Sequence, residues 1–234
     1  AAAPSAISGR VVVAMSGGVD SSVAAALLKQ KGLDVFGLTM NLFALPKAAC
    51  VSEELRSCCG AAARRDAGRV AALLGIPFYV ADFRRTFERE VISDFIAEYG
   101  RGRTPNPCLR CNRFVKFGPL LNRAARLGAE RIATGHYARV DFDKRLGRWR
   151  LRKAVDAAKD QSYFLYGLRQ EDLARTLFPL GGLRKTEVRK IAGRLGLPVA
   201  EKPESQEICF VPDDNYASIL VGRIPDAFRP GATV

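Results

Sequence analysis

Residues 11–22 read VVVAMSGGVDSS, and this stretch is the clearest indicator of the architecture. The apolar run at its start is typical of a buried β-strand. Two glycines and several small polar residues follow it, and residues 21–31 then carry a helical pattern that stops at Gly32. A strand, a tight turn and a helix in this order predict the first unit of a parallel α/β sheet.

Strands and helices continue to alternate outward from this unit. We expect further strands at residues 34–40, 76–81 and 131–134, and helices at 61–74, 86–99 and 116–127. Residues 100–108 are rich in Gly, Pro and Arg and are predicted to form a loop. The alternation predicts a doubly wound parallel sheet with helices on both faces, whose ligands bind beyond the carboxyl ends of the strands.

The pattern changes after Tyr137. Residues 138–142 and 149–154 are predicted to be two strands around the turn at 143–147, which makes a hairpin rich in basic residues. From Asp160 onward the pattern is mainly helical, most clearly at residues 185–195. The sequence therefore predicts an α/β domain at residues 1–140 and a small, mainly helical second region at 141–222.

The overall charge favours a polyanionic partner. The net charge is +13 and the isoelectric point is about 9.8, so nucleic acid is the favoured partner, the alternative being a merely soluble basic surface. No apolar run is long enough to span a membrane, so we expect no membrane association. Six cysteines without a secretory signal favour reactive thiols or metal ligands. We expect a cytoplasmic protein, with an organelle matrix as the open alternative.

The glycine-rich turn has the features of a phosphate-binding loop. Gly17 and Gly18 let backbone N–H groups approach a phosphate, and the following helix adds partial positive charge. The hydroxyls of Ser16, Ser21 and Ser22 are further donors, and Asp20 is a candidate magnesium ligand. The plain alternative is a structural turn that is capped by Asp20 or Ser21. The motif resembles the loop of the ATP pyrophosphatases, which split ATP between the α and β phosphates.

Two cysteines lie in an arginine-rich segment. Residues 101–112 read RGRTPNPCLRCN, in which Cys108 and Cys111 have Cys-x-x-Cys spacing. The nearby cations favour thiolate over thiol, and Cys209 is a third candidate thiol. A zinc site completed by Cys58 and Cys59 is an alternative. We expect Cys50, Cys58 and Cys59 to be small core residues.

Taken together, the motifs resemble those of the tRNA-specific 2-thiouridylases, over residues 11–216. The motifs are AMSGGVDSS at 14–22, GRTPNP at 102–107, CN at 111–112, KFG at 116–118, ATGHYAR at 133–139, KDQSYFL at 159–165 and SQEICF at 205–210. The resemblance implies an adenine nucleotide alpha hydrolase-like, Rossmann-like fold. It also implies ATP-dependent thiolation of the wobble uridine of tRNA through an adenylated base, with release of AMP and pyrophosphate. Residues 1–140 would bind the nucleotide, residues 141–222 would bind tRNA, and residues 223–234 would begin a truncated β-rich domain.

The resemblance also assigns roles to individual residues. Cys111 would be the nucleophile, and Cys209 would carry the persulfide. ATP would contact Ala14, Met15, Ser16, Gly17, Gly18, Val19, Asp20, Ser21, Met40 and Gly135. The target base would lie at Asn106, Pro107 and Cys108, and the rest of the tRNA would contact His136, Lys159, Asp160 and Gln161. For His136 a purely structural, hydrogen-bonded role is the alternative.

Position 108 departs from the family pattern, because many members carry Asp where this chain has Cys108. Cys108, Cys111 and Cys209 could hold a 4Fe-4S cluster with one open iron. They could equally form a persulfide relay, and both options stay open. The expected ligands and partners are ATP, Mg²⁺, tRNA and a sulfur donor protein, either a cysteine desulfurase or a sulfur relay. Two rival functions are an ATP pyrophosphatase that acts on a small molecule and a non-catalytic RNA-binding module with a metal-stabilised loop.

Overall fold

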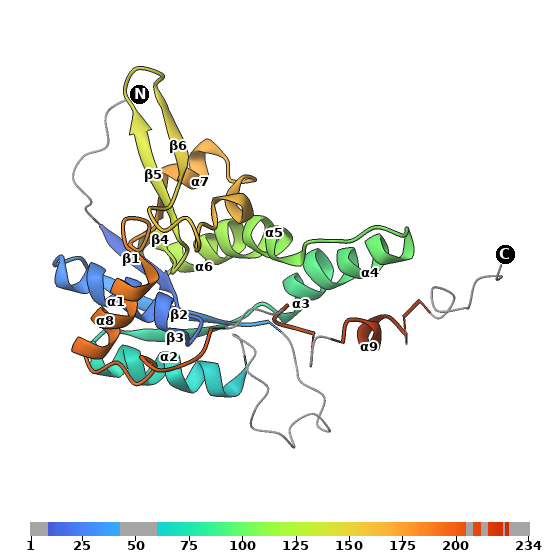
Figure 1. The fold of residues 1–234 in the computed structure, drawn as a ribbon, viewed down its shortest axis with the longest axis horizontal. Coiled ribbons are helices and arrows are strands. Elements are labelled where there is room, and N and C mark those ends of the chain that lie inside the picture. The colour runs from blue at the N-terminus through green and yellow to red at the C-terminus, as the bar shows by residue number, and fades with distance from the viewer. Residues whose placement is uncertain (1–8, 43–59, 205–207, 212–214, 222, 225–234) are drawn as a thin grey trace.

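The computed structural model describes residues 9–42, 60–204, 208–211, 215–221, 223 and 224. The centre of this part is a parallel sheet whose strands lie in the order β3-β2-β1-β4-β7 (Figure 1). Its strands are β1 (Arg10–Ala14), β2 (Val35–Asn41), β3 (Phe78–Asp82), β4 (Ala129–Ala133) and β7 (Thr176–Leu177). The chain first builds the sheet from β1 toward β3 and then crosses to the other side of β1 to add β4 and β7.

Strand β1 is the most deeply buried part of the sheet. Val11, Val12 and Val13 are completely buried. Because successive side chains of a strand point to opposite faces, Val11 and Val13 pack into one apolar cluster and Val12 packs into the other. The continuous apolar run of the sequence thus reflects a strand that is covered on both sides.

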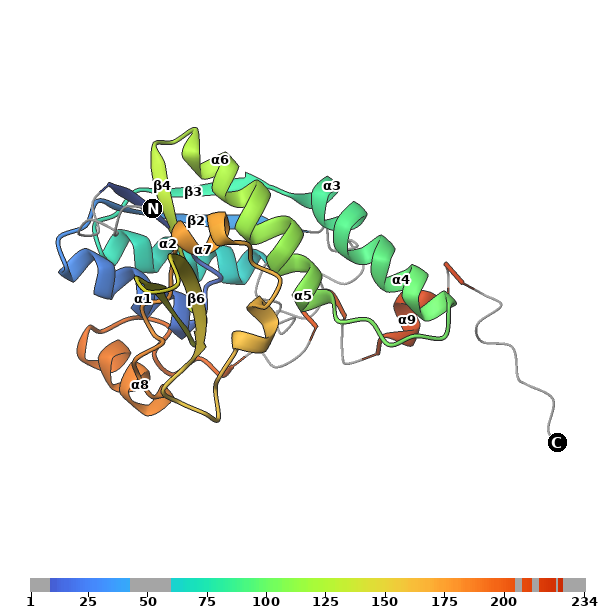
Figure 2. The same ribbon diagram turned by 90° about the horizontal axis from the view of Figure 1, so that it is seen from above.

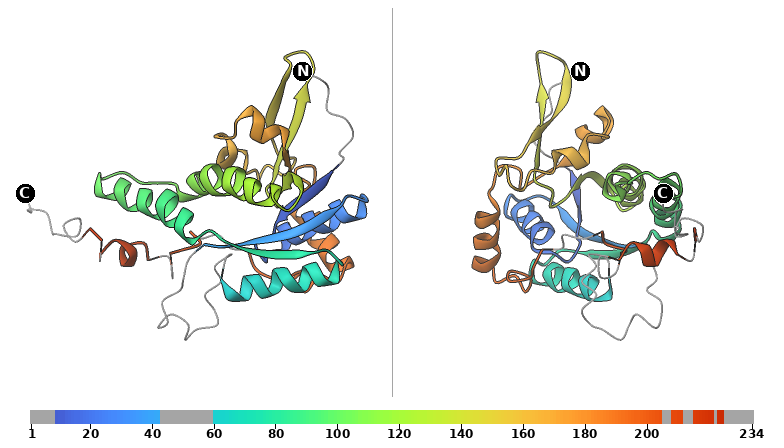
Figure 3. Two further views of the ribbon diagram at one scale, coloured as in Figure 1. Left: turned by 180° about the vertical axis from the view of Figure 1, so that it is seen from behind. Right: turned by 45° about the vertical axis from the view of Figure 1, so that its right-hand side comes forward.

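Helices cover both faces of the sheet (Figure 3). One layer consists of α1 (Val19–Gln30), α2 (Ala61–Leu73) and α8 (Lys185–Arg194). The other layer consists of two longer helices, each with a π-helical segment. The first runs through α3 (Arg84–Phe87), η2 (Glu88–Ile92) and α4 (Ser93–Gly100); the second runs through α5 (Pro107–Cys111), η3 (Asn112–Leu120) and α6 (Leu121–Ala125). Figure 2 shows these two helices side by side.

The remaining elements form a projection beside the sheet. The antiparallel hairpin consists of β5 (Ala138–Asp143) and β6 (Arg148–Lys153), and it stands out from the sheet in Figure 1. The 3₁₀ turn η4 (Ser162–Leu165) and helix α7 (Gln170–Ala174) lie against β6. Helix α9 (Ala217–Leu220) is the last described element. None of the described helices is both long and apolar enough to cross a bilayer.

The predicted doubly wound parallel sheet and the hairpin are confirmed, with two corrections. The helix expected at 116–127 begins at Pro107, so Cys108 lies in a helix and not in the predicted loop. Its early start has a local cause: Asn106 caps the helix by accepting a hydrogen bond from the backbone N–H of Leu109, and Pro107 suits the first helical position. Strand β7 was not predicted either, because it has two residues and no readable periodicity.

The strand β7 and helix α8 come from the region predicted at residues 141–222, yet β7 joins the central sheet and α8 packs on α1. The structure thus adds both elements to the sheet domain that was predicted at residues 1–140. Several predictions concern residues outside the described part of the chain. These are the core positions of Cys50, Cys58 and Cys59, residues 205–207 of the SQEICF motif, and residues 225–234.

Candidate nucleotide site and thiol segments

The turn between β1 and α1 lies at the point where the strand order reverses. Strand β2 pairs with one side of β1 and strand β4 with the other, so the chain extends the sheet in opposite directions from β1. A crevice at such a switch point is the usual ligand position in open α/β sheets. The turn after β1 and the turn after β4, which contains Gly135, both face it.

The loop backbone requires glycine at position 17. Gly17 has φ of 73°, a left-handed conformation that side chains disfavour. A Cβ atom there would also collide with the backbone carbonyl of Ala63 at the start of α2. The turn is therefore narrow, and its backbone is held between two helices.

The serine hydroxyls form hydrogen bonds within the loop. Ser22 Oγ donates to the Gly18 carbonyl at 2.8 Å, and Ser21 Oγ donates to the same carbonyl at 3.2 Å. Ser16 N donates to Ser21 Oγ at 3.2 Å. Gly18 is the N-cap of α1, and no side chain of the described residues caps this helix start. The first N–H groups of α1 therefore remain as the donors to an anion, which is the usual arrangement at a phosphate-binding helix.

Gly135 closes the other side of the crevice. A Cβ atom at this position would lie 2.6 Å from Ser21 N and 2.8 Å from the Asp20 carbonyl carbon. The turn after β4 therefore lies directly against the first turn of α1. Met40, near the end of β2, is buried, and the Thr39 hydroxyl beside it donates a hydrogen bond to the Met15 carbonyl. These contacts bring together the segments that were predicted to bind ATP.

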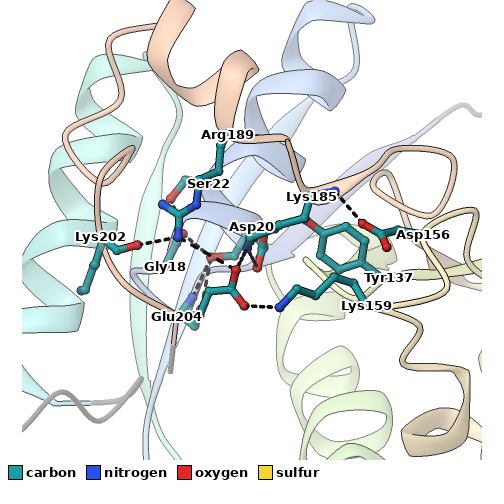
Figure 4. A network of polar contacts seen from close by, with 12 residues as sticks. Gly18, Asp20, Ser22, Tyr137, Asp156, Lys159, Lys185, Arg189, Lys202 and Glu204 are labelled. Carbon is teal, nitrogen blue, oxygen red and sulfur yellow. Dashed lines mark hydrogen bonds and ion pairs between the residues drawn. The ribbon is translucent and has the colours of Figure 1, made fainter. Parts of the chain in front are cut away.

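A network of charged side chains surrounds Asp20 (Figure 4). Lys185 Nζ lies 2.7 Å from both carboxylate oxygens of Asp20, and the Tyr137 hydroxyl donates to Oδ1 at 2.9 Å. Burial raises the pKa of Tyr137, and the negative charge of Asp20 raises it further, so the phenol keeps its proton and donates. Neither Lys185 nor Tyr137 was predicted as a site residue, because each lies more than a hundred positions from Asp20.

The predicted magnesium role of Asp20 requires an exchange of partners. A carboxylate suits magnesium, which prefers oxygen ligands. In this structure, however, both oxygens already accept from Lys185. Within the described ranges no three His, Cys, Asp or Glu side chains are placed to share a metal ion.

Cys108 and Cys111 lie on α5 in different surroundings. Cys108 is in the first turn and exposed, whereas Cys111 is buried with 7% of its surface accessible. Arg110, between them, donates to the Glu90 backbone carbonyl at 3.0 Å and lies 3.3 Å from Asp94. These contacts fix α5 to the helix formed by residues 84–100.

Cys209 approaches the same helix from another part of the chain. The neighbouring ring of Phe210 packs edge-on against Phe87 at 5.6 Å and against Phe95 at 5.2 Å. Half-buried Cys209 packs against the apolar cluster that contains Cys111 and Met40. The structure thus brings both predicted sulfur carriers to one cluster. No group of three metal-binding side chains is found in the described part of the chain, and the 4Fe-4S cluster stays a prediction.

The predicted tRNA contacts have internal partners in this structure. The His136 ring packs near Phe117 and Phe178, and its Nδ1 lies 2.8 Å from the Thr134 hydroxyl. Burial lowers the pKa of His136 well below 6.5, and Lys116 lowers it further, so the ring is neutral at pH 7. The other three residues make hydrogen bonds within the chain: Lys159 Nζ with Glu204 Oε2, Asp160 Oδ1 with Ala154 N, and Gln161 Oε1 with Tyr137 N.

A groove lies between the hairpin and the segment that follows it. Its volume is about 570 Å³, and it is lined by arginines of β6 together with Trp149 and the exposed ring of Tyr166. Basic residues beside exposed aromatic rings are typical of surfaces that bind RNA. A neighbouring pocket of about 210 Å³ extends from Tyr166 to Arg110 on α5.

Curated relatives match nearly the whole chain. A protein of Heliobacterium modesticaldum named tRNA-specific 2-thiouridylase MnmA is 56% identical over 225 residues, which are 96% of this chain and 58% of the relative. A protein of Geotalea uraniireducens with the same name is 58% identical over 90% of this chain and 56% of the relative. The chain therefore spans somewhat more than half the length of these relatives.

Solved structures share the fold at low sequence identity. A 4-thiouridine synthetase–RNA complex with bound ATP is 20% identical with a TM-score of 0.54, over 94% of this chain and 51% of that chain. A glutamine-dependent NAD⁺ synthetase from Acinetobacter baumannii is 14% identical with a TM-score of 0.50, over 85% of this chain and 32% of that chain. The family model described as the tRNA methyl transferase HUP domain matches residues 9–213. This chain belongs to that family.

Proposed function

We propose that this chain is the ATP-binding and sulfur-transferring part of a tRNA-uridine 2-sulfurtransferase. The observation that carries the proposal is the convergence of two sites. An uncapped helix start at a topological switch point suits a triphosphate, and one apolar cluster joins Met40 near that point to Cys111 and Cys209. The names of the relatives support tRNA as the substrate.

The first chemical step activates the base. The wobble uridine must leave its stack to reach the site. Its O2 atom attacks the α-phosphorus of ATP, pyrophosphate leaves, and the base becomes adenylated at O2. The first N–H groups of α1 stabilise the phosphate charge, and magnesium would add charge neutralisation if it took the place of Lys185 at Asp20.

The second step delivers sulfur. The terminal sulfur of a Cys209 persulfide attacks C2 of the base, and AMP leaves. The Cys111 thiolate then attacks the Cys209 sulfur, which releases 2-thiouridine and forms a Cys111–Cys209 disulfide. An external thiol reductant restores both cysteines, and a sulfur donor protein reloads Cys209. Cys108 is exposed on the first turn of α5 and would meet either the base or the sulfur donor.

The site also supports an assignment of partners by region. The first N–H groups of α1, Gly135 and Met40 would contact ATP. Asn106, Pro107 and Cys108 would lie at the target base. The loop that carries Lys159, Asp160 and Gln161 and the groove beside β6 would contact the rest of the tRNA. Cytoplasm is the expected compartment, because Cys111 and Cys209 must be reduced in each cycle.

The test is pyrophosphate release as a function of the RNA. The chain is incubated with ATP and either a tRNA that carries the wobble uridine or the same tRNA with cytidine at that position. We expect pyrophosphate release only with the uridine-containing tRNA. Release that a small carboxylate or amide acceptor supports equally well without RNA would favour the small-molecule enzyme, and absence of ATP binding would favour the non-catalytic module.

A further inference from the structure

Two lysines from the second half of the chain reach the rim of the glycine-rich turn. Lys202 Nζ donates to the Gly17 carbonyl at 3.0 Å and to Asp66 Oδ2 at 2.6 Å. Lys185 Nζ contacts both oxygens of Asp20 at 2.7 Å. Gly17 and Asp20 lie on the two sides of the α1 N-cap, so one ammonium group flanks each side of the helix start. Figure 4 shows Lys185 beside Asp20.

The surroundings of Lys185 make its positive charge costly for the stability of the fold. It is the first residue of α8, where the positive end of the helix dipole repels a cation. It is also buried, with 8% of its surface accessible, and moving a charge from water into the protein interior costs free energy. Asp20 and Glu204 offset part of both costs, and a polyanionic ligand at this point would offset them further, because it would attract the lysine and the helix start together.

Lys202 is held in place by a positioning residue on α8. Arg189 donates to the Ala200 carbonyl at 2.7 Å and to the Lys202 carbonyl at 3.1 Å. These bonds fix the backbone of residues 200–202 beside the turn, so the Lys202 side chain extends over Gly17. The half-buried ammonium group is then available to a ligand in the crevice.

The carboxylates of the network are exchangeable partners for these cations. Glu204 accepts from Lys159 at 2.7 Å and lies 3.3 Å from Lys185. Burial acts to raise the pKa of Glu204, but the hydrogen bond from Lys159 and the charge of Lys185 lower it overall, so it is ionised at pH 7. The described network contains five cations, Arg69, Lys159, Lys185, Arg189 and Lys202, against four carboxylates, Asp20, Asp66, Asp156 and Glu204. Its excess positive charge and the helix start next to it suit a polyanion.

We propose that Lys185 and Lys202 bind the β and γ phosphates of ATP and then the pyrophosphate product. When the triphosphate binds, the two ammonium groups exchange contacts with Asp20 and Asp66 for contacts with phosphate oxygens. This assignment rests on the proposed function, since it specifies how the same nucleotide site holds the leaving group. The adenosine and the α-phosphate do not depend on either lysine.

The test compares ligands that do and do not carry the β phosphate. Lys185→Met and Lys202→Met keep the aliphatic stem and remove the charge, and Lys190→Met changes a lysine elsewhere on the same helix α8 as the control. Titration calorimetry measures the affinity of each protein for inorganic pyrophosphate, α,β-methylene-ATP and AMP. We expect the affinity of each of the two site variants for pyrophosphate and the ATP analogue to fall about tenfold or more, with AMP affinity unchanged and the control equal to the wild type.

The outcomes separate the two proposals. Wild-type affinity for pyrophosphate and the analogue in both site variants would overturn the lysine assignment alone, as would an equal fall in affinity for AMP. Failure of the unsubstituted chain to bind the ATP analogue would instead refute the proposed function. A thermal melt checks that each variant folds. The Lys202→Met variant is decisive if Lys185→Met does not fold, because Lys202 is only partly buried.

Discussion

Among single residues, Gly135 matters because it lets two backbones touch without side chains between them. Gly135 lies so close to the first turn of α1 that an added Cβ atom would be 2.6 Å from Ser21 N. The nearest atoms belong to the backbone, which cannot move aside as a flexible side chain can. The same close approach that fixes the crevice therefore makes the position intolerant of substitution.

The Gly135→Ala substitution is expected to destabilise the fold by about 1–3 kcal/mol and to weaken ATP binding, because the α1 backbone must shift. The matched control is Gly193→Ala in helix α8, where a Cβ atom would meet nothing within 4 Å. That change should stabilise the protein by up to about 1 kcal/mol, since Ala favours the helix. Denaturant unfolding measures both, and equal stabilities of the two variants would refute the close approach.

His136 predicts a specific pH dependence of stability. Burial holds the pKa of this side chain well below its ordinary 6.5, so the unfolded chain binds a proton at pH values where the folded chain does not. The free energy of unfolding should therefore fall as pH decreases below about 6.5, with a limiting slope of about 1.4 kcal/mol per pH unit. The chain has one histidine, so His136→Gln should remove this slope. Urea unfolding between about pH 5.5 and pH 7.5 measures it, and a slope that persists in the variant would contradict the assignment.

Among the helices and strands, the sequence patterns predicted those elements that depend on residues close in the sequence. The buried run at Val11 to Val13 and the glycines after it predicted β1, the turn and α1, because each depends on residues close in sequence. The start of α5 was missed although Asn106 and Pro107 are an N-cap and a first helical residue, because the surrounding Gly, Pro and Arg suggested a loop. The ion pairs of Lys185 and Lys202 could not be predicted, since they join residues far apart in the sequence.

The β5–β6 hairpin is the element that we expect to contact RNA phosphates. Lys144→Glu and Arg148→Glu change exposed residues at its tip and should weaken tRNA binding without changing ATP affinity. The slope of binding affinity against salt concentration should become shallower by about one unit for each phosphate that the variant no longer binds. Arg65→Glu on α2, which lies across the sheet from the hairpin in Figure 1, is the control. An equal effect of Arg65→Glu would show that only net charge matters.

Across the molecule as a whole, the topology brings distant segments to one edge. The strand order places the turn after β1 next to the turn after β4, and the helix of residues 84–100 holds both the Cys111 helix and the segment with Cys209. The strand order itself is not visible in the sequence. The resemblance to the tRNA-specific 2-thiouridylases nevertheless implied that the turn after β1, Met40 and Gly135 share one nucleotide site, and the structure brings these segments close together.

The decisive measurement is the nucleoside content of tRNA after incubation with the chain, ATP, a sulfur donor protein that carries a persulfide, and a thiol reductant. Digestion and mass spectrometry should show 2-thiouridine only when ATP is present. Cys111→Ser and Cys209→Ser should each give none while they retain ATP affinity. Thiolation at the wild-type rate by either serine variant, or in the absence of ATP, would contradict the proposed sulfur transfer.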